Sequence, residues 1–109
     1  MYQRSGDVPI GVPSNMVQYA ALTLMLSHLT GYEPYEYVHT ISDAHIYEDQ
    51  IEKIEPMLLR EPLRLPTVRL TEEGKKVTDI HDFRGEHFEI SDYEPHPSIP
   101  KIPVATWLT

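Results

Sequence analysis

The strongest constraint on the fold of this chain is an apolar segment that runs from Met16 to Leu29. Its apolar side chains fall on nearly every side of the helix that the segment predicts, a pattern typical of a helix in a protein interior. Ser14 or Asn15 can cap the N-terminus of this helix, and Gly31 suits the position after its C-terminus. We therefore expect one long buried helix that begins near Met16.

The length of the chain limits what can cover such a helix. With 109 residues it has room for one small domain, and a domain of this size buries only about 65% of the surface that its unfolded chain exposes. The few other predicted elements offer limited area to pack against a helix that is apolar all round. We expect the chain either to dimerise through an apolar face or to form one part of a larger protein.

Composition excludes several classes of protein. The net charge of −8 argues against a surface that coats nucleic acid, which would be basic. The absence of Cys excludes disulfides, thiolate metal sites and cysteine nucleophiles within these 109 residues. The longest apolar run, from Ala20 to Leu29, is shorter than the roughly 20 residues that span a membrane, and no secretory signal is visible. We expect a cytoplasmic protein without a nucleic-acid or membrane partner.

The remaining elements alternate between the two types of secondary structure, which predicts a mixed α/β (α+β) fold. Residues 1–15 are expected to be extended chain and turn, because Pro9, Gly11 and Pro13 disfavour a helix there. A helix with an interruption at Pro56 is predicted over residues 46–59. Residues rich in β-branched and aromatic side chains predict strands; these segments are 37–41, 63–70 and 88–90.

Several polar residues near the N-terminus could bind a ligand, although each has a simpler structural explanation. The guanidinium of Arg4 beside the hydroxyl of Ser5 is suited to phosphate, yet such a pair is more often solvated surface. Asp7 is typical of a turn, and Asn15 is typical of a helix cap. The residues alone leave both interpretations of each side chain open.

Histidines supply further candidates. His45 and Tyr47 alternate along an extended segment, which places both side chains on one face. A second group contains metal-compatible side chains without a recognised ligand spacing, so we expect a polar surface turn there and no metal site; it comprises His81, Asp82, Glu86 and His87. His28 lies near the predicted helix C-terminus, and no role is assigned to His39 or His96.

Taken in order, the motifs of the chain resemble those of the thymidylate synthase family. They are Arg4-Ser5 with Asp7, Gly11-Val-Pro13 and Asn15, the apolar helix, Val38–Tyr47, Arg60-Glu-Pro62 and Tyr93-Glu-Pro-His-Pro97. The resemblance covers essentially the whole chain but only the C-terminal part of that family, without the half that carries the nucleophilic Cys. It implies one domain over residues 1–109 within a mixed-sheet fold, in which dimers form by packing sheets face to face.

The resemblance also implies a ligand for each candidate residue. The matching family residues hold dUMP: its phosphate for Arg4 and Ser5, its base for Asn15, and the 3′-hydroxyl of its deoxyribose for His45 and Tyr47. Gln3 is a secondary candidate at the same site. The co-substrate 5,10-methylenetetrahydrofolate is expected at Asp7, Gly11 and Ala105. An amide can flip to suit uracil or cytosine, so the selection of uracil by Asn15 requires neighbours that lock its orientation.

These expectations define three alternative functions. The first is the C-terminal part of a thymidylate synthase that converts dUMP to dTMP only together with the missing half, either in a homodimer or with that half as a partner. The second is a non-catalytic nucleotide-binding module derived from the enzyme. The third is a pyrimidine nucleotide hydroxymethylase relative, which Asn15 disfavours. The chain departs from the family pattern at Ser14, where an aromatic residue is usual, and in the Thr106–Thr109 tail with its Trp107.

Overall fold

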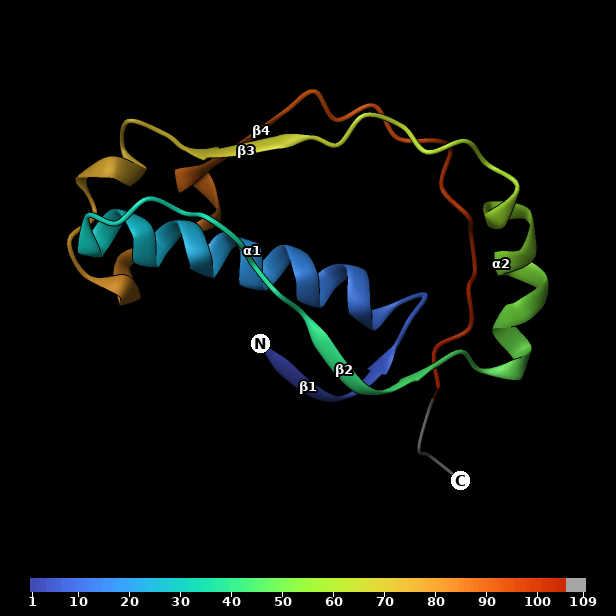
Figure 1. Cartoon of the computed structure of the whole chain (residues 1–109). Coiled ribbons are helices and arrows are strands. Elements are labelled where there is room, and N and C mark those ends of the chain that lie inside the picture. Colours follow the sequence, from blue (N-terminus) through green and yellow to red (C-terminus); the bar gives the residue numbers. More distant parts are fainter. Residues whose placement is uncertain (106–109) are drawn as a thin grey trace. The chain divides into compact units, whose positions relative to one another are not determined.

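The computed structural model describes residues 1–105 and has the predicted α+β composition (Figure 1). Single 3-10 turns occupy Glu48–Gln50, Gly74–Lys76, Ile80–Asp82 and Gly85–His87. The helices and strands are β1 (Tyr2–Asp7), α1 (Gly11–Thr30), β2 (Thr40–His45), α2 (Ile51–Leu58), β3 (Thr67–Leu70) and β4 (Phe88–Ser91).

Residue contacts divide the chain into two compact units. The first contains Met1–Val17, Val38–Pro62 and the described residues from His96 on, and the second contains Gln18–Tyr37 and Leu63–Pro95. Helix α1 contributes residues to both units.

The first unit is built around the parallel pair β1–β2, whose register places Gln3 opposite Ile41 and Asp7 opposite His45 (Figure 1). Gly6 is buried in the middle of this arrangement. A Cβ atom at Gly6 would lie 2.9 Å from Cγ2 of Val12, so the absence of a side chain at Gly6 lets β1 approach the first turn of α1 closely. This approach positions the polar residues of β1 near those of α1.

Two motifs that are far apart in the sequence meet in the first unit. The guanidinium of Arg60 donates to the carbonyl of Pro97 over 2.9 Å. The Nε2 atom of His96 lies 2.8 Å from the carbonyl oxygen of Glu61, which can only accept, so the imidazole donates. These two bonds join the Arg-Glu-Pro and Pro-His-Pro segments and give His96 a structural role that the sequence did not indicate.

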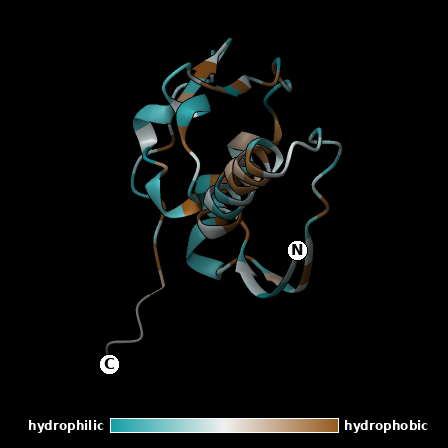
Figure 2. Cartoon of the chain, turned by 90° about the vertical axis from the view of Figure 1, so that its left-hand side faces the viewer, coloured by the Kyte–Doolittle hydropathy of each residue, from teal (hydrophilic) through white to brown (hydrophobic). Residues whose placement is uncertain are grey.

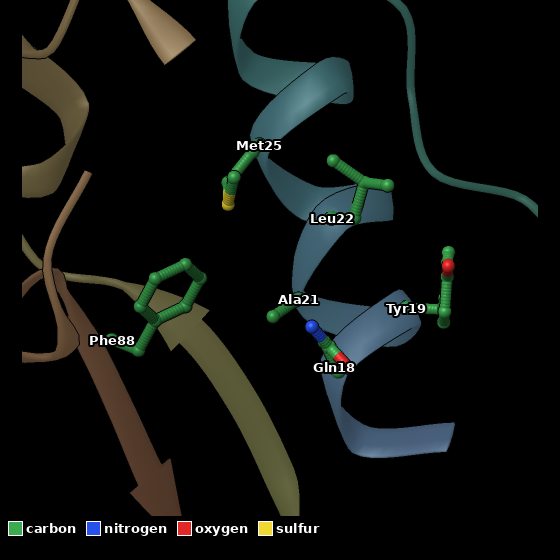
Figure 3. Close-up of a pocket in the computed structure, with 6 residues that line it drawn as sticks. All are labelled: Gln18, Tyr19, Ala21, Leu22, Met25 and Phe88. Carbon is green, nitrogen blue, oxygen red and sulfur yellow. The ribbon is translucent and has the colours of Figure 1, made fainter. Parts of the chain in front are cut away.

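The second unit contains the antiparallel pair β3–β4, with Thr67 opposite Ser91 and Leu70 opposite Phe88. Its buried apolar residue is Phe83, whose ring makes an edge contact with His28 at a centroid distance of 6.3 Å. An apolar groove of about 330 Å³ lies along α1 in this unit, where Met25 and Phe88 point toward the same space (Figure 3). Its lining residues are Gln18, Tyr19, Ala21, Leu22, Met25 and Phe88.

Helix α1 begins five residues earlier than predicted, at Gly11, and Pro13 lies in its first turn. The expectation that Pro13 disfavours a helix was wrong because the first N–H groups of a helix have no partner within it, so a proline costs nothing there. Asn15 is consequently a helical residue and not the N-cap. The C-terminal prediction is confirmed: Gly31 has a φ of 78° and donates to the carbonyl of Ser27 over 3.0 Å.

The predicted burial of α1 is absent from this chain. None of its residues is buried, although hydrophobic residues recur along its ribbon (Figure 2). The buried hydrophobic residues among residues 1–105 are Ile54 and Phe83, neither of which belongs to α1. The physical reason is that the chain supplies too few other elements to surround a helix that is apolar on all sides.

Smaller differences concern the element boundaries. The strand predicted over residues 37–41 lies at Thr40–His45, and the strand predicted from residue 63 begins at Thr67, directly after Pro66. The 46–59 segment divides into the 3-10 turn at Glu48–Gln50 and α2, which contains Pro56 and ends at Leu58. A proline deprives the last turn of one intrahelical bond, and this favours an early end to the helix.

Candidate ligand site

The residues predicted to bind ligands all lie in the first unit. They occupy β1, the first two turns of α1, the end of β2 and the short stretch after it, and the C-terminal segment. In chain order they are Gln3, Arg4, Ser5, Asp7, Gly11, Asn15, His45, Tyr47 and Ala105.

A hydrogen bond between Gln3 and Asn15 connects β1 to α1. The side-chain nitrogen of Gln3 donates to Oδ1 of Asn15 over 2.9 Å and to the carbonyl of Ser5 over 2.8 Å. Because Oδ1 of Asn15 accepts from this amide, its Nδ2 is the group that can donate to a ligand. Selection of uracil by Asn15 requires a neighbour that fixes the orientation of its amide, and Gln3 is such a neighbour.

His39 extends this network by one residue. Its Nε2 atom lies 2.8 Å from Oε1 of Gln3, which can only accept, so Nε2 carries a proton. The Gln3 amide therefore receives a hydrogen bond at its oxygen and donates two from its nitrogen. Donation from His39 disfavours the flipped Gln3 amide, and the orientation of Asn15 depends on Gln3.

A second network surrounds Gln50, whose side chain is fully buried at 0% exposure. Its Nε2 atom lies 3.2 Å from each carboxylate oxygen of Asp7 and donates over 2.9 Å to the carbonyl of Pro103. Its Oε1 atom accepts from the backbone N–H of Tyr47 over 2.9 Å. Asp7 is thus oriented by an amide rather than by the local turn that its sequence position suggested.

His45 and Tyr47 are brought together as predicted, with ring centroids 5.1 Å apart at an interplanar angle of 80°. Nδ1 of His45 lies 3.2 Å from the carbonyl oxygen of Asp43, so Nδ1 is the donor and Nε2 of the neutral ring is an acceptor. An imidazole nitrogen that accepts and a phenol that donates can together hydrogen bond to one hydroxyl group.

Arg4 and Ser5 are not brought to a common side of β1. The burial of the strand alternates, with Arg4 exposed and Ser5 half-buried, because successive side chains of a strand point to opposite faces. Gly11, in the first turn of α1, lies near both networks: a Cβ atom there would be 3.7 Å from Oδ1 of Asn15 and 3.8 Å from Cβ of Asp7. Ala105 is the last residue that the structure describes, and the Thr106–Thr109 tail with Trp107 lies outside the described residues.

The histidines of the second unit have structural partners. Nε2 of His28 lies 3.0 Å from the carbonyl oxygen of Val77, and the ring of His87 contacts Phe83 at a centroid distance of 6.1 Å. The backbone N–H and the ring of His81 both hydrogen bond to the carboxylate of Asp79. These bonds stabilise the charged form and lower the pKa of the Asp79 carboxyl group. Residues 1–105 contain no cluster of three side chains that could hold a metal ion.

Two residues of these networks, His39 and Gln50, were missed by sequence reasoning. The hydrogen-bond partners of the Gln50 side chain include Asp7, 43 residues before it, and Pro103, 53 residues after it. No local pattern distinguishes a glutamine with such distant partners from an exposed one. The nearest signal was the position of Gln50 shortly after the His45–Tyr47 pair.

Fold and site together define an α+β protein in which two amide-centred networks arrange the polar residues of a parallel strand pair. The family model for thymidylate synthase matches residues 1–106. The chain therefore belongs to the thymidylate synthase family.

Individual relatives agree with this assignment. The chain is 48% identical over 99 residues to the thymidylate synthase of Homo sapiens, covering 91% of this chain and 31% of that protein. It is 44% identical over 100 residues to the thymidylate synthase of equine herpesvirus 2, covering 92% of this chain and 34% of that protein. A solved structure of thermostable thymidylate synthase A from Bacillus subtilis superposes with a TM-score of 0.79 at 31% identity, covering 89% of this chain and 34% of that one.

The chain thus spans about a third of the length of these relatives. Among residues 1–105, no helix has both the length and the apolar character needed to cross a membrane.

Proposed function

We propose that this chain binds dUMP and 5,10-methylenetetrahydrofolate for the reductive methylation of dUMP to dTMP, as the C-terminal part of a thymidylate synthase. Under this proposal both units belong to one family domain over residues 1–109, in a cytoplasmic protein. The single observation that carries the proposal is the hydrogen bond from Gln3 to Asn15.

This bond supports the recognition of uracil over cytosine. With Oδ1 of Asn15 held by Gln3, Nδ2 donates to uracil O4, and the second lone pair of Oδ1 accepts from uracil N3–H. Cytosine presents the reverse pattern, an N4 donor beside an N3 acceptor. Reversing the Asn15 amide to suit cytosine would place two nitrogen donors, those of Asn15 and Gln3, against each other.

The remaining groups supply a contact for each other part of the two ligands. Nε2 of His45 and the phenol of Tyr47 bind the 3′-hydroxyl of deoxyribose. Ser5 binds the phosphate from one face of β1, and Arg4, which is exposed on the opposite face, reaches it round the strand with its long side chain. Asp7 keeps lone pairs beyond those used by Gln50 and accepts from the pterin ring of the folate. Gly11 and Ala105 approach the folate closely through their backbone.

The chain binds these molecules without transforming them. By resemblance to the family, the reaction begins with attack of a Cys thiolate on C6 of dUMP, and the folate then supplies the methylene group and a hydride. This sequence has no Cys, so the nucleophile must come from a polypeptide that contains the rest of the enzyme. We propose that dimerisation or association with that part completes the site.

Calorimetric titration of the chain with dUMP tests the proposal. Arg4→Ala should weaken binding by about tenfold or more, because an Arg–phosphate contact is charge-assisted, whereas Arg64→Ala should have little effect. Arg64 is a matched control because it forms an exposed ion pair with Asp92 in the other unit. Equal affinities of the wild type and Arg4→Ala, or no binding at all, would contradict the proposal.

The claim of inactivity has its own test. The isolated chain is expected to release no tritium from dUMP labelled at C5, even with 5,10-methylenetetrahydrofolate present, because release requires the thiolate addition at C6. Tritium release above that of a buffer control would refute this part of the proposal.

A further inference from the structure

Among residues 1–105, Gln50 is the polar residue whose side chain is fully buried, and its amide is matched to its surroundings. Its N–H groups face acceptors, namely the carboxylate of Asp7 and the carbonyl of Pro103. Its oxygen faces a donor, the N–H of Tyr47. A buried amide without these partners would be costly. Residue 50 therefore needs a side chain that contains both a hydrogen-bond donor and an acceptor.

The three partners of Gln50 belong to three separate segments. Asp7 is the last residue of β1, Tyr47 follows β2, and Pro103 lies in the C-terminal segment. The backbone of Gln50 is itself fixed, because its N–H donates to the carbonyl of Tyr47 over 2.9 Å within the 3-10 turn. Gln50 therefore connects all three segments through hydrogen bonds.

We propose that Gln50 is a positioning residue that couples the folate contacts to the deoxyribose contacts. It touches neither ligand. Its amide sets the plane of the Asp7 carboxylate, holds the backbone of Tyr47 and ties down the C-terminal segment two residues before Ala105. The inference rests on the proposed function for the identity of the ligands, but the attachment of the C-terminal segment to Gln50 can be tested without any ligand.

The first experiment compares amide hydrogen exchange by NMR in the unliganded full chain. Gln50→Met keeps the approximate volume of the side chain and removes every polar contact. We expect exchange at Val104 and Ala105 to accelerate about tenfold, while exchange within β1 and β2 stays close to that of the wild type. Gln18→Met is the matched control, because Gln18 is exposed on α1 and its replacement should leave the C-terminal amides unchanged. Unchanged exchange at Val104 and Ala105 in Gln50→Met would overturn the attachment.

The second experiment separates the two ligands. The chain is saturated with dUMP and then titrated with 5,10-methylenetetrahydrofolate in a calorimeter. Gln50→Met should weaken folate binding by about tenfold, because the Asp7 carboxylate loses a donor and the C-terminal segment loses its tether. Binding of dUMP should weaken less, about two- to threefold, because Gln50 reaches the dUMP contacts only through the backbone of Tyr47, whereas the phosphate and base contacts have no bond to Gln50. A purely structural defect would instead weaken both ligands together.

A second variant guards against loss of folding. Gln50→Glu keeps the acceptor for Tyr47 and the shape of the side chain, but it sets a second carboxylate against Asp7, so it should weaken folate binding at least as much as Gln50→Met. Folate affinity within twofold of the wild type in both folded variants would overturn the coupling. If the wild-type chain binds no dUMP, the proposed function fails and the coupling fails with it, and the exchange experiment alone decides the attachment.

Discussion

At the scale of single residues, Asn15 is the most sharply defined group of the proposed nucleotide site. The residue lies in the second turn of α1, and its carboxamide is held by Gln3, which His39 holds in turn. Each donor in this series faces an atom that can accept. An amide held in this way discriminates between bases that differ only in the direction of their hydrogen bonds.

Replacing Asn15 by Asp should reverse the base preference of the chain. A carboxyl group still accepts from Gln3, and its second oxygen accepts from the N4 donor of cytosine but repels O4 of uracil. A proton shared between its first oxygen and the N3 acceptor of cytosine completes the pair. We expect dUMP affinity to fall by about tenfold or more and affinity for dCMP to exceed it, since an unpaired or mismatched polar group costs about 1–3 kcal/mol. Competitive titration with dUMP and dCMP measures the preference, and retention of the uracil preference would argue against Asn15 as the base-reading residue.

At the scale of elements, the second unit depends on a close contact between two 3-10 turns. Gly74 is buried in the turn at Gly74–Lys76, and a Cβ atom there would lie 2.6 Å from the carbonyl oxygen of His87. That same carbonyl accepts from the N–H of Thr71 over 2.9 Å, directly after β3. A side chain at residue 74 would therefore disturb the end of the β3–β4 pair as well as the turn.

We expect Gly74→Ala to lower the free energy of unfolding by about 1–3 kcal/mol, the usual range for a side chain forced into an occupied space. Gly85→Ala is the matched control, because nothing lies within 4 Å of a Cβ atom at residue 85, and it should leave stability unchanged or slightly raised. Urea unfolding followed by circular dichroism measures both variants. Equal stability of the two variants would show that the contact at Gly74 yields without cost.

At the scale of the whole molecule, the apolar residues of α1 stay unburied and few apolar side chains are buried elsewhere in residues 1–105 for the same reason: the chain has too few elements to cover its helix. The chain has a helix suited to a protein interior, but the buried hydrophobic residues among residues 1–105 are Ile54 in one unit and Phe83 in the other. Since burial of apolar surface is the main source of stability, the chain by itself has little to stabilise it.

The isolated chain should accordingly unfold in a broad urea transition, with an m-value of about 1 kcal/mol/M or less, because little surface becomes newly exposed. It should also enhance the fluorescence of an apolar dye. Leu22→Gln, in the groove along α1, should reduce the dye signal while the helical circular dichroism is retained. A steep transition with an m-value of about 2 kcal/mol/M and no dye binding would contradict this expectation.

The sequence by itself determined the α+β class, the long helix that ends just before Gly31, and the placement of His45 and Tyr47 on one face. These features depend on neighbouring residues: on apolar spacing, on the positive φ that glycine tolerates, and on the alternation of side chains along an extended segment. Local rules also misplaced the start of α1. They predicted a start near Met16 because of Pro13, but a proline is compatible with the first turn of a helix, and α1 begins at Gly11.

Only the tertiary structure decided how the site is held together. The Gln3–Asn15 bond joins residues 12 apart, and Gln50 meets partners 43 and 53 residues away. Hydrogen bonds over such separations depend on the pairing of β1 with β2 and on the path of the C-terminal segment, which no local pattern encodes. Tertiary structure also showed that α1 is not buried within this chain, because burial depends on what surrounds a helix and not on its own sequence.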